Sequence, residues 1–175
     1  MSKKLFGLLV VLLLVGCGGK APSVLEVPNK GSRLNPLPFD EPYTFVGTYG
    51  DYPVEFTICL RELIRGSEAV KKMKSDYQFN KRDKGEEPIY FTVDFRLDYL
   101  ESEDDDFFYI DDDMFEYFKS DYALYKSRGI LWGYNYLDSE MYEGSSTSGQ
   151  VGLIIPKKDV GYICFKDNLW FKLPD

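Results

Sequence analysis

The feature that most constrains the fold of this chain is a strict alternation of side-chain character from Ile89 to Tyr99. The odd-numbered positions are apolar or aromatic: Ile89, Phe91, Val93, Phe95, Leu97 and Tyr99. The even-numbered positions are mostly polar: Tyr90, Thr92, Asp94, Arg96 and Asp98. Successive side chains of a β-strand point to opposite faces, so this pattern predicts a strand with one buried and one wet face. Such a strand is typical of an antiparallel sheet covered on one side.

Shorter runs rich in β-branched and aromatic residues predict more strands along the rest of the chain. They cover residues 43–49, 54–60, 107–110, 115–118, 130–136, 150–155, 161–165 and 169–173. The segment from Gly144 to Gly149 is expected to be a flexible turn. One short helix is expected over residues 67–77, because Ser67 can cap a turn that places Ala69 and Met73 on one side. These elements predict a mainly β fold, an antiparallel β-sandwich with one helix.

The N-terminus has the layout of a secretion signal. Lys3 and Lys4 precede an apolar run, residues 5–15, that is too short to span a bilayer as a helix of about 20 residues. The run leads into Leu-Val-Gly before Cys17, which is the pattern of a lipoprotein signal. Two acyl chains, such as palmitate, anchor a protein stably. We therefore expect a signal peptide over residues 1–16, a lipidated Cys17, and a position on the extracytoplasmic face of the cell membrane.

Beyond the signal, the composition divides the chain in two. Residues 17–35 are rich in Gly, Pro, Ser, Lys and Asn, which is the composition of a flexible tether. Residues 36–175 are expected to form one domain. Hydrophobic residues make up 44% of the chain, which is ample for a core of that size without a metal or a disulfide.

Charge and the absence of histidine exclude several functions. The formal net charge is −8, and it becomes −10 if Lys3 and Lys4 leave with the signal, so nucleic acid is an unfavourable partner. The chain has no histidine, which removes Ser-His-Asp and Cys-His machinery and most zinc hydrolase sites. We therefore expect no enzyme activity. A carboxylate-based cell-wall hydrolase remains as the least favoured alternative.

Acidic residues gather in the middle of the chain, where eleven carboxylates lie between Asp98 and Asp121 and only Lys119 opposes them. Two aspartate triplets stand out: Asp104, Asp105 and Asp106, and then Asp111, Asp112 and Asp113. With Tyr109, these are the predicted partner-binding residues, because an acidic rim steers a basic partner and tyrosine makes an efficient recognition surface. The main alternative to partner binding is that this acidic loop binds Ca²⁺. No metal ligand is assigned, because both triplets miss the EF-hand spacing.

Two cysteines remain besides Cys17, and both fall in predicted strands: Cys59 and Cys164. In an extracytoplasmic setting such a pair permits one disulfide, which would close a long loop. The alternation around Cys59 places it on the polar face of its strand, with Glu55 and Thr57. A solvent-side thiol and a bridge across neighbouring strands fit this pattern equally well, so connectivity stays open.

Several short motifs occur in an order that resembles a known family. They are the lipobox, Asn35-Pro36, Gly66-Ser67-Glu68-Ala69, Tyr77-Gln78-Phe79-Asn80, Ile89-Tyr90-Phe91-Thr92-Val93, Tyr142-Glu143-Gly144-Ser145, Gly149-Gln150-Val151-Gly152-Leu153-Ile154-Ile155-Pro156 and Leu169-Trp170-Phe171-Lys172-Leu173. Together they resemble the telokin-like, immunoglobulin-like lipoprotein domains of unknown function found mainly in Gram-positive bacteria. The resemblance implies an immunoglobulin-like β-sandwich outside the cell membrane and supplies no catalytic residues. The aspartate triplets and the two cysteines depart from the family pattern.

The expected function is therefore that of a non-enzymatic surface lipoprotein. Its membrane contact is the lipid anchor, and its partner is an envelope protein or a cell-wall ligand. No cofactor is expected.

Overall fold

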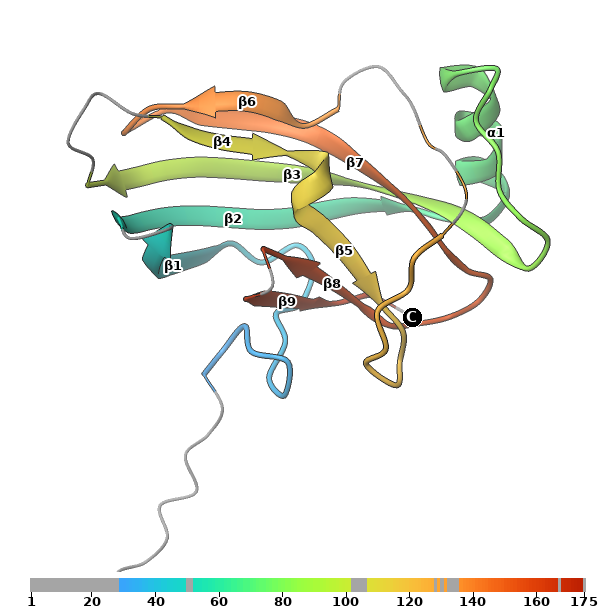
Figure 1. Ribbon diagram of the computed structural model, residues 1–175, viewed down its shortest axis with the longest axis horizontal. Coiled ribbons are helices and arrows are strands. Elements are labelled where there is room, and N and C mark those ends of the chain that lie inside the picture. The colour runs from blue at the N-terminus through green and yellow to red at the C-terminus, as the bar shows by residue number, and fades with distance from the viewer. Residues whose placement is uncertain are drawn as a thin grey trace, which may run out of the picture.

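The computed structural model describes residues 29–49, 52–101, 107–127, 129, 131, 136–166 and 168–174. Figure 1 shows antiparallel sheets with one short helix, so the prediction of a mainly β fold is confirmed. The elements in chain order are β1 (Tyr43–Tyr49), β2 (Tyr52–Ile64), α1 (Gly66–Asp76), β3 (Glu86–Leu100), β4 (Phe108–Asp111), the 3₁₀ turn η1 (Asp112–Met114), β5 (Phe115–Phe118), β6 (Asp138–Met141), β7 (Ser146–Pro156), β8 (Tyr162–Phe165) and β9 (Leu169–Lys172).

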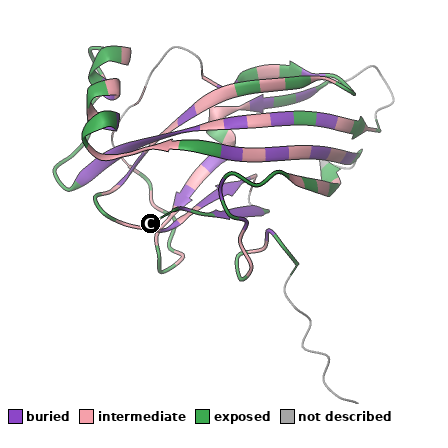
Figure 2. Cartoon of the chain, turned by 180° about the vertical axis from the view of Figure 1, so that it is seen from behind, coloured by how far each residue is buried: buried purple, intermediate pink, exposed green. Residues whose placement is uncertain are grey.

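The largest sheet has four antiparallel strands in the order β1-β2-β3-β7. The alternation that predicts β3 is visible in its burial: Phe95 and Leu97 are buried, whereas Arg96 is exposed and Asp94 is half-buried. Figure 2 shows the same alternation as stripes along β2 and β3. One face of this sheet therefore lines the core, and we call the other its outer face.

The remaining strands form two smaller antiparallel sheets, β4-β6 and β5-β8-β9. The β5-β8-β9 sheet lies across the core from the four-stranded sheet. The ring centroids of Phe115 and Phe91 are 5.8 Å apart, and those of Phe165 and Phe56 are 5.7 Å apart. β4 closes part of the same core with Phe108, whose ring stacks on another core phenylalanine at 5.3 Å. Burial of these large apolar side chains is the main term that holds the sheets together.

Helix α1 covers one end of the outer face of the four-stranded sheet. Ala69 and Met73, on its predicted apolar side, are buried against Tyr90 of β3. The Nζ atom of Lys72 lies 5.1 Å from the centroid of the Tyr90 ring. The prediction of one short amphipathic helix is thus confirmed, but Ser67 does not cap it: the N-cap position is Arg65, and no side chain caps the helix. Within the residues that the structure describes, no helix is long and apolar enough to cross a membrane.

The start of the described chain packs against β9. Trp170 N–H donates to the Gly31 carbonyl at 2.8 Å, and Leu37 N–H donates to the Trp170 carbonyl at 2.8 Å. Gly31 has φ +87°, and a Cβ there would lie 2.6 Å from Leu169 Cδ1, so both the backbone and the space favour glycine. Packing therefore extends N-terminal to Pro36, into the segment that composition assigns to the tether.

The structure differs from the strand predictions in two places. β7 begins at Ser146, inside the expected turn of residues 144–149, because β3 is long enough to pair with it as far as Arg96. β6 has no counterpart in the sequence prediction; its Asp138 and Glu140 are residues that strands disfavour. The predicted strand over residues 130–136 lies mostly outside the described residues.

Candidate partner-binding surface

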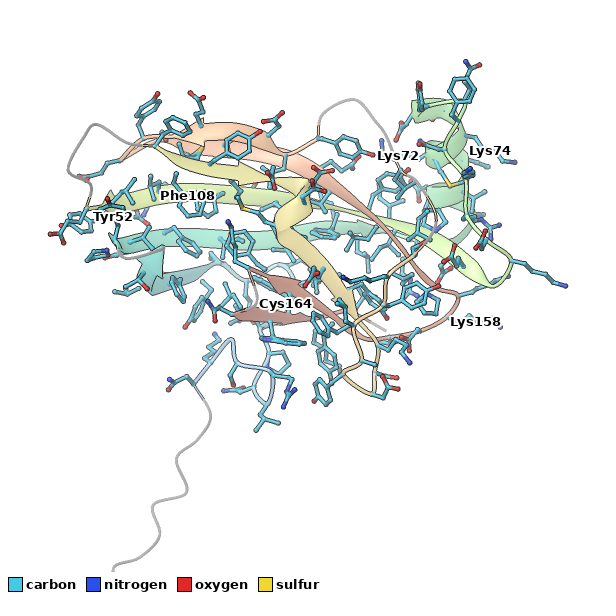
Figure 3. All side chains as sticks on the ribbon, viewed as in Figure 1. Tyr52, Lys72, Lys74, Phe108, Lys158 and Cys164 are labelled. Atoms are coloured by element: carbon cyan, nitrogen blue, oxygen red, sulfur yellow. The ribbon has the colours of Figure 1, made fainter. Side chains whose placement is uncertain are left out.

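The surface that best fits partner binding is the outward side of the two-stranded sheet of β4 and β6. Its register pairs Phe108 with Met141, Tyr109 with Glu140 and Asp111 with Asp138. Phe108, Ile110 and Met141 turn inward and are buried, so the alternating residues turn outward. We call the outward set the ribbon face; it consists of Phe107, Tyr109, Asp111, Asp138, Glu140 and Tyr142. In Figure 3, Phe108 marks where this ribbon joins the core.

Aromatic rings form the apolar part of the ribbon face. Phe107 is 42% exposed and Tyr142 is 52% exposed, and their ring centroids lie 6.1 Å apart across the two strands. The hydroxyl of Tyr109 donates to Asp138 Oδ1 at 2.5 Å, which fixes the exposed ring beside the carboxylates. Exposed aromatic rings next to charged groups are typical of recognition surfaces.

Negative charge accumulates where the ribbon face meets η1. Burial raises the pKa of the half-buried Asp112, and the charges of Asp113, Asp111 and Asp138 raise it further. The pKa of Tyr109 rises to about 12, chiefly because its hydroxyl donates to Asp138. Neighbouring carboxylates contribute to both shifts, after burial for Asp112 and after the hydrogen bond for Tyr109. Within the described residues, no ion pair joins these carboxylates to a lysine or arginine.

A hollow of about 400 Å³ lies beside η1. It is lined by Asp111, Asp113, Met114, Glu116 and Lys166. Among the described residues, no three Asp, Glu, Cys or His side chains are arranged so that they could hold a metal ion. The hollow therefore offers mainly carboxylate acceptors, which suit the ammonium or guanidinium donors of a basic ligand.

The predicted partner-binding residues and Cys17 fall into three groups. Tyr109 and Asp111 lie on the ribbon face, and Asp112 and Asp113 continue it into η1. Cys17 and the triplet of Asp104, Asp105 and Asp106 lie outside the described residues. The pairing of β4 with β6 adds Asp138 and Glu140, which sequence reasoning missed. Their alternation with Ser139 and Met141 was the one available signal, and it is too short to stand out.

The two cysteines are not joined by a disulfide in the structure. Cys59 alternates with the core residues Ile58 and Leu60, so it faces the outer side of the four-stranded sheet. Cys164 alternates with the core residues Ile163 and Phe165, so it faces the outer side of the β5-β8-β9 sheet. The hydrophobic core thus separates the two thiols, which is why the Cys59–Cys164 disulfide that the sequence left open is absent. Burial is the main cause that raises the pKa of the Cys59 thiol.

Two buried glutamates lie at the start of β3, Glu86 and Glu87, and the sequence analysis did not predict a role for them. Glu87 accepts from Arg65 at 2.7 Å and from the Lys158 N–H at 3.0 Å. Glu86 accepts from the Tyr125 hydroxyl at 2.7 Å and from the Asp83 N–H at 2.7 Å. Burial opposes ionisation of each glutamate, but these donors outweigh it and lower the pKa of both. Both carboxylates hold neighbouring loops in place, which is a structural role.

Comparison of the chain with protein-family models, with curated proteins and with solved structures finds no match in any of the three. The function has to follow from the chemistry of the surface itself.

Proposed function

We propose that this protein is a membrane-anchored extracytoplasmic lipoprotein without enzyme activity, whose ribbon face binds a basic partner at the cell surface. The observation that carries the proposal is the ribbon face itself. It sets the exposed rings of Phe107 and Tyr142 beside Asp111, Asp138 and Glu140, which make no ion pair within the described residues. Carboxylates attract a cationic segment from a distance, and the rings add contact area and cation–π attraction.

The fold that goes with this proposal is an immunoglobulin-like sandwich of the telokin-like lipoprotein type. Support comes from a four-stranded sheet that faces a three-stranded one, the strand numbers of a constant-type immunoglobulin domain. The pairing of β8 with β9, and of β5 with β8, also resembles the three-stranded sheet of that domain. β1, β2 and β3 pair in chain order, which is a meander and differs from the immunoglobulin order.

Membrane anchoring is supported by the order of Lys3 and Lys4, the apolar run and Cys17. We expect cells that express the protein to incorporate radiolabelled palmitate into it, and Cys17→Ser to abolish the label. Cys59→Ser serves as the control and should label normally. Palmitate in the Cys17→Ser protein would overturn the anchor.

Partner binding is tested with a fluorescent oligolysine peptide and the triple variant Asp111→Asn, Asp138→Asn, Glu140→Gln. Each exposed charge contributes about 0.5 kcal/mol, so the triple variant should weaken binding by about tenfold. The matched control is Glu41→Gln, Glu55→Gln, Glu68→Gln, which changes the net charge equally at other exposed or half-exposed sites. Thermal unfolding checks that both variants fold.

The control variant should bind the peptide nearly as the unmodified protein does. Added salt should steeply weaken peptide binding by the control variant and by the unmodified protein. Equal losses in the two triple variants would mean that net charge alone attracts the peptide. That result would remove the ribbon face from the proposal.

A further inference from the structure

The outer side of the β5-β8-β9 sheet carries a second aromatic surface, distinct from the ribbon face. Ile163, Phe165 and Phe171 of this sheet point into the core, so the residues that alternate with them point outward. On this side of β8 and β9, Tyr162 is half-buried and Trp170 is buried under its neighbours. Cys164 in Figure 3 marks this sheet, on the side of the core opposite Phe108.

The rings of this surface are held in a fixed cluster. Tyr122 stacks on Tyr162 with centroids 4.8 Å apart and planes at 11°, and their hydroxyl oxygens are 3.2 Å apart. Phe118 packs on Trp170 at 4.5 Å. Tyr122 has φ +64°, which a bulky side chain rarely adopts, and its N–H donates to the Lys119 carbonyl at 2.8 Å. The turn therefore fixes the direction of the Tyr122 ring.

Exposed apolar and basic side chains surround this cluster. Leu34 is 71% exposed at the tip of the turn of residues 31–35, and Leu124 is also exposed. The guanidinium carbon of Arg33 lies 5.4 Å from the centroid of the Tyr122 ring. Trp170 lies buried beneath these side chains, and we call Arg33, Leu34, Tyr122, Leu124 and Tyr162 the anchor-side face. Exposed leucine, amphipathic aromatic rings and arginine are the side chains that settle at a membrane–water interface.

The short stretch of sequence between this face and the proposed lipidation site indicates what the face contacts. The described chain begins at Asn29, next to the turn that carries Arg33 and Leu34. Only residues 17–28 separate it from Cys17. The composition of this segment predicts a flexible tether, and a tether of that length has a root-mean-square span of about 20 Å, so it would hold this end of the domain near the bilayer.

The arrangement in Figure 1 agrees with such a placement. The turn of residues 31–35 and the turn of residues 119–124 project on the same side of the molecule, below β5, β8 and β9. β4 and β6 lie along the opposite edge. The carboxylates of the ribbon face would therefore be held away from anionic lipid, which repels them.

We propose that the anchor-side face rests on the phospholipid surface, with Leu34 and the aromatic rings at the level of the lipid headgroups and Arg33 close to lipid phosphate. The inference rests on the proposed lipid anchor at Cys17. It gives the domain one orientation, in which the ribbon face points away from the membrane and toward a partner.

The test is tryptophan quenching with the lipidated protein inserted into preformed vesicles. The vesicles contain phosphatidylcholine and phosphatidylglycerol in equal parts, with bromine on the acyl chains. Leu34→Trp is compared with Val46→Trp, because Val46 is 74% exposed and lies on β1, outside the anchor-side face. Trp132 and Trp170 are common to both variants, so the signal of the unmodified protein is subtracted.

We expect the added tryptophan at position 34 to be quenched about twofold more strongly than the one at position 46, since bromine quenches only at short range. Equal quenching at the two positions, or stronger quenching at position 46, would overturn the inference. The intact mass of the same sample shows whether the lipid is attached. A lipidated protein with equal quenching refutes only the orientation, whereas a protein without lipid refutes the anchor and the orientation together.

Discussion

At the scale of single residues, the buried tyrosines Tyr90 and Tyr117 differ in how their hydroxyls are hydrogen-bonded. The Tyr117 hydroxyl donates to Asp159 at 2.9 Å and accepts from the Gly161 N–H at 2.9 Å. The Tyr90 hydroxyl is buried beneath α1 and makes no hydrogen bond within the described residues. Burial raises the pKa of both hydroxyls, so both remain protonated at neutral pH.

This difference predicts opposite results for the same substitution. Tyr117→Phe should lower the free energy of unfolding by about 1–3 kcal/mol, because Asp159 and Gly161 lose a buried partner. Tyr90→Phe should leave the free energy of unfolding nearly unchanged or raise it slightly, since it removes a hydroxyl that has no partner. Urea unfolding at neutral pH measures both. A larger loss for Tyr90→Phe than for Tyr117→Phe would contradict the hydrogen bonding described here.

The raised pKa of Asp112 predicts that Asp112→Asn stabilises the fold and that this gain depends on pH. Its pKa is raised in the folded state, chiefly by burial and then by neighbouring carboxylates, so ionisation of Asp112 destabilises the fold. The penalty is present above the folded pKa and disappears as the pH falls below the unfolded value. Asp112→Asn should therefore raise the melting temperature at neutral pH, and the gain should vanish in acid. Thermal unfolding followed across pH measures this effect.

Glu87 provides the control of opposite sign. Hydrogen bonds from Lys158 and Arg65 outweigh the burial of Glu87 and lower its pKa, so its ionised form stabilises the fold. That contribution is present above the unfolded pKa and is lost as the pH falls through the folded pKa. Glu87→Gln should lower the melting temperature at neutral pH, and the difference from the unmodified protein should shrink in acid. The same direction of change in both variants would contradict the two pKa shifts.

At the scale of elements, the ribbon of β4 and β6 is attached to the four-stranded sheet through β7. Leu137 N–H donates to the Gln150 carbonyl at 3.1 Å, and the hydroxyls of Ser139 and Thr147 are 3.0 Å apart. Gly149 allows this close approach, because a Cβ there would lie 2.6 Å from Leu137 Cα. The position of the ribbon face therefore depends on a glycine in a neighbouring strand.

Gly149→Ala should displace the ribbon and lower the free energy of unfolding by about 1–3 kcal/mol, the usual cost of overpacking. Hydrogen exchange should quicken at residues 138–141, and binding of the oligolysine peptide should weaken. Ser148→Ala is the control. It changes the residue that precedes Gly149 and removes a hydrogen bond to Asp94 without adding bulk. Unchanged exchange at residues 138–141 in Gly149→Ala would show that the contact with Leu137 is not close.

At the scale of the whole molecule, the two sheets keep Cys59 and Cys164 on opposite outer faces with the core between them. We expect both thiols to react with iodoacetamide after denaturation without any reductant. Intact mass then shows two more alkyl groups than a protein with a Cys59–Cys164 disulfide would carry. Alkylation that requires reductant would mean that the sheets are arranged differently.

How much of the structure follows from sequence depends on the range of the interactions. The strands around β3 and the helix α1 were predictable, because the two-residue alternation of a strand and the 3.6-residue repeat of a helix are local patterns. The ribbon face was predicted only in part. Tyr109 and Asp111 lie in an acidic run that the sequence displays, whereas Asp138 and Glu140 join them through a strand pairing that local propensity disfavours.

The sequence by itself determined the mainly β class and the one short helix of the described residues. It also determined that acidic residues concentrate in the middle of the chain and apolar residues at its N-terminus. These properties depend on composition and on the spacing of neighbouring residues. Only the tertiary structure decided which faces meet. It separated Cys59 from Cys164, buried Glu86 and Glu87 among donors distant in the chain, and paired β4 with β6. Such contacts depend on how the sheets pack across a shared core, and that packing is a property of the whole chain.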